Sequence, residues 1–142
     1  MIVLDTNVVS EVMKPKPSAM VLSWMEAHPR ERLFITTVTQ AEILYGVQLL
    51  PAGRRRAALQ ADIDSMLNVE FAGRILPFDE QAASAFSRIA ADRRTSGRPI
   101  SDFDAQIAAI AFSRGASIAT RDVRDFEDCG AVVLNPWAGP NS

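Results

Sequence analysis

Short apolar segments alternate along this chain with longer segments in which apolar residues recur every three or four positions. The apolar segments have the length of strands and lie at residues 1–4, 33–36, 74–77, 117–120 and 131–134. The segments between them have the period of helices that cover a sheet. This alternation predicts an α/β fold: a three-layer α/β/α sandwich around a central, mainly parallel sheet of about five short strands.

Capping residues and helix breakers set the expected helix boundaries. Helices are predicted at residues 6–13, 18–27, 39–49, 54–69, 79–94 and 101–114. Ser101 is the expected N-cap of the last helix, and Gly115 ends it. Residues 1–4 are wholly apolar, which is typical of a central strand buried on both faces. No repeat or linker interrupts the pattern, so we expect one domain over residues 1–142.

Composition narrows the class of protein. With 48% hydrophobic and 23% charged residues, the chain resembles ordinary globular domains. Cys129 is the only cysteine and His28 the only histidine, which argues against a disulfide framework or a zinc site. We see no export signal and no apolar run near the roughly 20 residues of a membrane span, so we expect a cytoplasmic protein without a membrane partner. The net charge of −2 argues against bulk electrostatic coating of nucleic acid.

Acidic residues gather where the predicted strands end. Asp5 directly follows the first strand, Glu42 lies shortly after the second, and Asp122 follows the strand that ends at Thr120. Ligands of doubly wound sheets bind beyond the carboxyl ends of the strands, where the topology reverses. Asp104, in the first turn of a helix, can reach the same edge if the preceding loop brings the helix start there.

A second acid, Asp102, lies near Asp104, and helix geometry separates the two. Residues two apart point roughly 200° apart around a helix axis, so only one can face the cleft. Asp104 shares the inward stripe of Ile107 and Ala108, whereas Asp102 aligns with Gln106. We therefore choose Asp104 as the site residue, while a contribution from Asp102 stays open.

Each acid also has an ordinary explanation. Asp5 could cap the helix that follows it, and Thr39-x-x-Glu42 matches a capping box. Asp104 suits the dipole of a helix start, and Asp122 belongs to an acidic loop. Unrelated caps, however, have no reason to converge on one edge of one sheet. Oxygen ligands without histidine or thiol select Mg²⁺ or Mn²⁺, so the sequence predicts a divalent-metal site.

Four segments in order resemble the PIN-domain ribonucleases, and among them the toxins of VapBC-type toxin–antitoxin pairs, including the FitB-like branch. The segments are Met1-Ile2-Val3-Leu4-Asp5-Thr6-Asn7, Thr39-Gln40-Ala41-Glu42-Ile43-Leu44-Tyr45-Gly46, Asp104 before Ile107-Ala108-Ala109-Ile110-Ala111, and Ala119-Thr120-Arg121-Asp122 with Phe126. The closing Asn135-Pro136-Trp137 is similar to the C-terminus of FitB-like members. The resemblance spans almost the whole chain.

The resemblance implies a metal-dependent endoribonuclease of PIN-like fold. Asp5, Glu42, Asp104 and Asp122 would hold one or two Mg²⁺ or Mn²⁺ ions, and Thr6, Asn7 or Thr120 would hydrogen-bond those ligands. Mutual repulsion of the carboxylates predicts raised pKa values in the metal-free site. The implied partners are an RNA substrate and a small antitoxin that inserts into the acidic cleft. A homodimer is expected, which bound antitoxin can enlarge.

The sequence leaves the substrate contacts and two alternative functions open. Arg93, Arg94 and Arg98 could grip an RNA backbone, and Arg98 adjoins the loop before Asp104. A Mg²⁺-dependent DNA nuclease and a non-catalytic PIN-like binding module are the alternative functions, although no acid of the pattern is missing. A phosphoryl-accepting receiver domain would need a lysine near the last strands, and both lysines precede residue 17.

Overall fold

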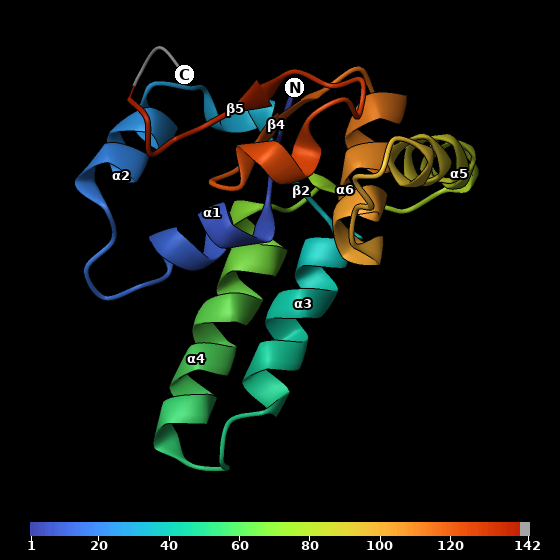
Figure 1. Cartoon of the computed structure of the whole chain (residues 1–142). Helices are drawn as coiled ribbons and strands as arrows, with labels where there is room; N and C mark the ends of the chain where they lie inside the picture. Colours follow the sequence, from blue (N-terminus) through green and yellow to red (C-terminus); the bar gives the residue numbers. More distant parts are fainter. Residues whose placement is uncertain (140–142) are drawn as a thin grey trace.

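Five short strands form a wholly parallel sheet at the centre of the computed structural model, which describes residues 1–139 (Figure 1). The strands are β1 (Ile2–Leu4), β2 (Leu33–Thr36), β3 (Ile75–Leu76), β4 (Ser117–Ala119) and β5 (Val133–Leu134). The predicted α/β sandwich is confirmed, and the five strands occupy the five expected segments. Residues 140–142, the end of the predicted domain, lie outside the described residues.

Helices fill the connections between the strands. They are α1 (Thr6–Val12), α2 (Ala19–Glu26), α3 (Thr37–Gln48), α4 (Arg54–Ser65), α5 (Glu80–Thr95) and α6 (Asp102–Ser113). Two short 3₁₀ helices, η1 (Arg30–Arg32) and η3 (Val123–Phe126), and a π-helical end of α4, η2 (Met66–Glu70), complete them. Figure 1 shows α3 and α4 as a hairpin that projects from the sheet. Within residues 1–139, no helix is long and apolar enough to cross a membrane.

The start of α3 differs from the expected one. Thr36 is the N-cap, and its Oγ1 accepts a hydrogen bond of 3.1 Å from the backbone N–H of Thr39. Thr39 therefore lies inside the helix, and the predicted Thr39-x-x-Glu42 capping box is wrong. Glu42 is not needed to cap the helix, so its carboxylate is available for another role.

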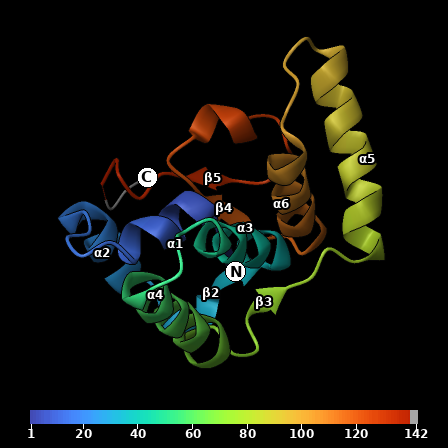
Figure 2. The same cartoon turned by 90° about the horizontal axis from the view of Figure 1, so that it is seen from below.

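Each face of the sheet is covered by its own set of helices. Val3 and Ile118 pack with residues of α5 and α6, whereas Ile2 and Leu4 pack with α1, α2 and α4. Figure 2 shows these two helical layers on opposite sides of the strands. Because successive side chains of a strand point to opposite faces, an apolar strand can supply both cores. The doubly buried first strand that the sequence predicted is observed, with Ile2, Val3 and Leu4 all buried.

The strand order β3-β2-β1-β4-β5 places the reversal of topology beside β1. The chain moves from β1 to β2 and β3 on one side, then crosses to β4 and β5 on the other. Leu4 is in register with Ala119, and the N–H of Asp5 donates to the carbonyl oxygen of Ala119 at 2.9 Å. The ends of β1 and β4 therefore meet at the crevice where such sheets bind ligands.

A buried arginine joins the two loops that lead to this crevice from the α6 side. Arg93 is only 5% exposed. Its guanidinium donates to the carbonyl oxygens of Arg98, Asp125 and Glu127 at 2.8, 2.8 and 3.0 Å. These bonds tie the loop before α6 to η3. Because its guanidinium is engaged inside the protein, Arg93 is not available to grip RNA.

We predict that Arg93→Ala destabilises the protein by about 2–4 kcal/mol, because the buried side chain is removed and three part-buried carbonyl groups lose their charged donor. Arg94→Ala is the matched control, since Arg94 is exposed and adjacent in sequence. It should change the free energy of unfolding by no more than about 0.5 kcal/mol. Urea unfolding followed by circular dichroism measures both, and equal effects of the two substitutions would contradict the role given to Arg93.

Candidate active site

Asp5 lies at the carboxyl end of the central strand and is 5% exposed. Its Oδ1 accepts the backbone N–H of Thr6 at 2.8 Å, and its Oδ2 accepts the hydroxyl of Thr120 at 2.8 Å. It occupies the N-cap position of α1, as the capping interpretation expected. The cap uses only one oxygen, and the other is directed to the end of β4, so capping alone does not account for this side chain.

Glu42 is joined to the start of α1 through threonine hydroxyls. Thr6 Oγ1 donates to Glu42 Oε1 at 2.8 Å and lies 2.9 Å from Thr39 Oγ1. Since Thr6 has only one hydroxyl hydrogen and gives it to the carboxylate, Thr39 must donate to Thr6. Thr39 is completely buried and lies inside α3, whose N-cap is Thr36, three residues before the expected cap at Thr39. This network sets the position of the Glu42 carboxylate.

Asn7 links the ends of β1 and β4 in the same way. Its Nδ2 donates to Asp122 Oδ2 at 3.0 Å and to Thr120 Oγ1 at 3.3 Å, and its Oδ1 accepts the backbone N–H of Arg121 at 3.3 Å. Thr120 Oγ1 also accepts the N–H of Asp122 at 3.0 Å. One amide and one hydroxyl therefore fix the turn that presents Asp122.

Asp104 reaches the crevice from the first turn of α6. Ser101 caps this helix, its Oγ accepting the N–H of Asp104 at 3.2 Å, so the Asp104 carboxylate is not used as a cap. The carboxylate lines the same pocket as Asp5, whereas Asp102 is exposed and does not line it. The buried residues Ile107 and Ala108 continue the stripe of Asp104 toward the sheet.

The four acids line one pocket of about 440 Å³. In the described part of the chain, none of them makes a salt bridge. Also within residues 1–139, no three side chains of aspartate, glutamate, histidine or cysteine are close enough to hold one ion between them. The pocket therefore concentrates negative charge without forming a cage made only of protein ligands. That donor set suits Mg²⁺, which commonly uses one or two carboxylates and keeps several waters.

Burial dominates the electrostatics of the two central acids. It raises the pKa of Asp5 from its ordinary value of 3.8 to about 6, against the opposing hydrogen bonds from Thr120 and Thr6, while Asp104 and Glu42 add repulsion. Burial also raises the pKa of Asp104, with smaller repulsion from Asp125, Glu42 and Asp122. The sequence predicted raised values from mutual repulsion. Repulsion contributes, but loss of water is the larger cause.

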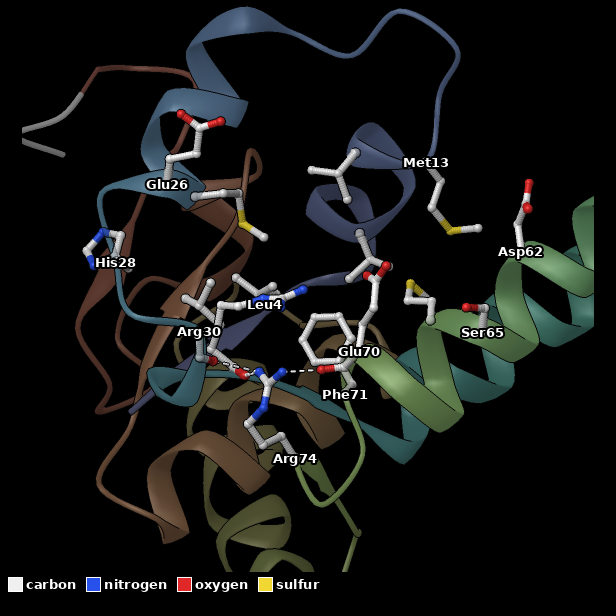
Figure 3. A pocket seen from close by; sticks show the side chains of 15 residues that line it. Leu4, Met13, Glu26, His28, Arg30, Asp62, Ser65, Glu70, Phe71 and Arg74 are labelled. Atoms are coloured by element: carbon white, nitrogen blue, oxygen red, sulfur yellow. Dashed lines mark hydrogen bonds between the residues drawn. The ribbon is translucent and has the colours of Figure 1, made fainter.

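A larger cavity, of about 630 Å³, lies on the α1, α2 and α4 side of the sheet, and none of the four acids lines it (Figure 3). Phe71 and Leu4 contribute to its apolar lining. Arg74 donates to the carbonyl oxygen of Arg30 at 2.7 Å and also to those of Leu33 and Glu70. This arginine is a crosslink between backbone segments rather than a cation presented to a ligand, so we locate the candidate active site in the smaller, acidic pocket.

Further residues line the acidic pocket besides the four acids, Thr6 and Asn7. They are Ser10, Glu11, Lys14, Arg121 and Trp137. Arg121 and Trp137 belong to the motifs that carry the family resemblance, whereas Ser10, Glu11 and Lys14 do not. Arg98, the candidate RNA contact, is not among the lining residues and forms ion pairs with Glu127 at 3.5 Å and with Asp128. The adjacency of Arg121 to Asp122 was a sequence signal, but the approach of residue 137 depends on the fold.

This chain belongs to the PIN-domain family, which matches residues 2–131. Within that family it belongs with the VapC- and FitB-like toxins. It is 42% identical over 137 residues to VapC ribonuclease Y4jK of Sinorhizobium fredii, covering 96% of this chain and 98% of that protein. It is 38% identical over 137 residues to toxin FitB of Neisseria gonorrhoeae, covering 96% of this chain and 99% of FitB.

Solved structures agree with this assignment. The crystal structure of FitAcB from Neisseria gonorrhoeae matches with a TM-score of 0.90 at 38% identity, over 96% of this chain and 99% of the other. Other neighbouring structures are VapBC complexes of toxin–antitoxin systems. The family resemblance inferred from the sequence motifs is confirmed.

The buried carboxylate of Asp5 should make metal-free stability depend on pH. Its pKa in the folded state, about 6, exceeds the ordinary value of 3.8, so the folded protein binds this proton more tightly than the unfolded chain. The resulting stability is present at low pH and is lost as the pH rises through about 6. Between about pH 4 and about pH 7.5, the free energy of unfolding of the wild type should fall by about 2 kcal/mol more than that of Asp5→Asn.

Urea unfolding in EDTA at both pH values measures this difference. Asp102→Asn is the control, because Asp102 is exposed at the start of the same helix as Asp104. The change in its free energy of unfolding between the two pH values should equal that of the wild type. If the free energy of unfolding of Asp5→Asn changes with pH by the same amount as that of the wild type, the Asp5 carboxyl does not titrate as the structure indicates.

Proposed function

We propose that this protein is a Mg²⁺- or Mn²⁺-dependent endoribonuclease and the toxin component of a VapBC-type pair. The observation that carries the proposal is the pocket at the sheet reversal. Asp5, Glu42, Asp104 and Asp122 all line this pocket, and none of them makes a salt bridge among the described residues. The names of the related ribonucleases support RNA as the substrate class. An RNA substrate would place its activity in the cytoplasm.

The uncompensated charge of the pocket supports a bound cation. Asp5 is buried and receives two hydrogen bonds, which do not lower its pKa to the ordinary value. Burying a carboxylate without a partner is costly, and the cost is relieved by a proton or by a cation. Asp5 and Asp104 would be the central ligands, since they are the acids whose pKa burial raises.

The remaining acids are supported by fixed hydrogen-bond donors. Thr6 holds Glu42, and Asn7 holds Asp122, so each carboxylate is oriented from a neighbouring strand end. A bound divalent ion would activate water and neutralise charge on the scissile phosphate. The chain's own residues bind and orient that ion, and a carboxylate such as Asp104 can accept a proton from the attacking water. No protein nucleophile or histidine is required, so we expect 5′-phosphate and 3′-hydroxyl products.

Cleavage of single-stranded RNA should require Mg²⁺ or Mn²⁺ and stop in EDTA. We expect Asp5→Asn and Asp104→Asn to reduce the rate by more than about 100-fold, because loss of groups that merely support a metal ligand already costs about 10–100-fold. Thr120→Val, which removes the hydroxyl donor to Asp5, should fall within that smaller range. Gel analysis of end-labelled RNA measures all three.

Asp102→Asn is the matched control, because the same charge is removed two residues from Asp104 but outside the pocket. It should retain the wild-type rate. Full cleavage in EDTA, or by both pocket variants, would refute the metal-dependent mechanism. Cleavage of single-stranded DNA in preference to RNA would instead identify the protein as a DNA nuclease, and binding without cleavage would identify a non-catalytic module.

The same charge supports an antitoxin that enters the pocket. Neighbouring structures of this family are toxin–antitoxin complexes, which supports an antitoxin partner for this chain. We propose that a small cognate antitoxin places a basic side chain among the four acids. Such a contact would satisfy the buried charge and block the substrate at the same time.

The affinity of the cognate antitoxin should therefore fall by about tenfold or more in Asp104→Asn, and little in Asp102→Asn. Isothermal titration calorimetry in EDTA measures this without a competing metal. Equal affinities for both variants would place the antitoxin elsewhere on the surface. Light scattering of the free and antitoxin-bound protein tests the expected homodimer and its enlargement by antitoxin.

A further inference from the structure

One cation lies on the lining of the acidic pocket without an acidic partner in the described part of the chain. Arg121 is exposed and directly follows Thr120, whose hydroxyl holds Asp5. Within residues 1–139 its guanidinium makes no salt bridge and no hydrogen bond. The pKa of Glu11 is lowered mainly by the hydrogen bond from Lys14, and the charge of Arg121 adds to this effect. Lys14, the other cation of the lining, is paired with Glu11 at 3.1 Å.

The side chain of Arg121 is held by an aromatic ring. Its Cζ lies 5.3 Å from the ring centroid of Trp137, in cation–π contact. Its backbone is fixed independently, because its N–H donates to Asn7 Oδ1 at 3.3 Å. A residue anchored at both ends loses less freedom when it binds a ligand, so it is better prepared for binding than a free surface arginine.

The C-terminal motif Asn135-Pro136-Trp137 positions the Trp137 ring against Arg121. Asn135 Oδ1 accepts the backbone N–H of Trp137 at 2.9 Å, which turns the chain back toward the pocket. The carbonyl oxygen of Leu134 accepts the N–H of Thr120 at 2.9 Å, so the motif begins beside the residue that precedes Arg121. Trp137 also packs against the core on the α1 and α2 side. The ring is therefore a fixed platform.

A phosphate chain entering this pocket meets negative charge from four acids and favourable charge mainly from Arg121. Arginine is well suited to phosphate because its planar guanidinium can donate two parallel hydrogen bonds. One face of the Trp137 ring is already taken by the guanidinium, which favours a supporting role for the ring over stacking with a base. Arg98 and Arg93 lack this freedom, because acids and backbone carbonyls respectively engage them.

We infer that Arg121, supported by Trp137, binds an RNA backbone phosphate adjacent to the scissile one, and that Trp137 is a positioning residue acting through Arg121. This inference rests on the proposed function. It assigns a role to the Arg121 of the last acidic motif and to the closing tryptophan, neither of which belongs to the set of metal-binding acids.

RNA binding without cleavage tests the role of Arg121. Fluorescence anisotropy of a labelled single-stranded RNA is measured in EDTA with Asp104→Asn protein, alone and combined with Arg121→Gln. We expect Arg121→Gln to raise Kd by about tenfold and to make the slope of log affinity against log salt less negative by about 0.7, the value for one phosphate of single-stranded RNA. The Kd of Arg121→Lys should lie between that of the parent protein and that of Arg121→Gln.

Arg124→Gln is the matched control, because Arg124 is exposed three residues later and outside the pocket lining. It should leave Kd and the salt slope unchanged. Equal behaviour of Arg121→Gln and Arg124→Gln would overturn the inference, as would failure of the parent protein to bind RNA. Neither result depends on the cleavage assay with EDTA, which decides the proposed function separately.

The role of Trp137 is tested by combining substitutions. Trp137→Leu should raise Kd, Trp137→Phe should largely restore it, and Trp137→Leu with Arg121→Gln should bind RNA no more weakly than Arg121→Gln alone. Thermal unfolding followed by circular dichroism verifies that each variant is folded. Additive losses in the double variant would overturn the positioning role, because the ring would then contact RNA directly.

Discussion

The buried carboxylate of Asp5 is the constraint around which the pocket is organised. The central strand β1 is covered on both faces, so the first residue beyond its end enters a region with little water. Two hydrogen-bond donors do not compensate the lost hydration, and the pKa of Asp5 remains at about 6. Either a proton or the cation of the proposed function would relieve the cost of burying this carboxylate.

Threonine and asparagine side chains connect the segments that carry the acids. Thr6 joins α1 to α3, Thr120 joins β4 to Asp5, and Asn7 joins α1 to the turn of Asp122. The carboxylates of Asp5, Glu42 and Asp122 are consequently each held by a hydrogen-bond donor. The acids do not form a closed cage among the described residues, an arrangement compatible with an ion that keeps several waters, as Mg²⁺ commonly does.

The arginines of this protein serve different purposes according to their surroundings. Arg93 and Arg74 bind backbone carbonyls and connect loops, and Arg98 pairs with acids on the surface. Arg121 is supported by an aromatic ring on the lining of the acidic pocket. In sequence all are equivalent cations. Burial and the nearest acceptor decide which of them stabilise the fold and which can meet a ligand.

The sequence by itself determined the α/β class, the strand segments and the four acids, because apolar periodicity and strand ends are local features. It also favoured Asp104 over Asp102 from helix geometry alone. Tertiary structure decided the rest. Thr36 rather than Thr39 caps α3, burial rather than repulsion dominates the Asp5 pKa, and Trp137 meets Arg121. These outcomes depend on contacts between segments distant in the chain, which residue patterns along the sequence do not encode locally.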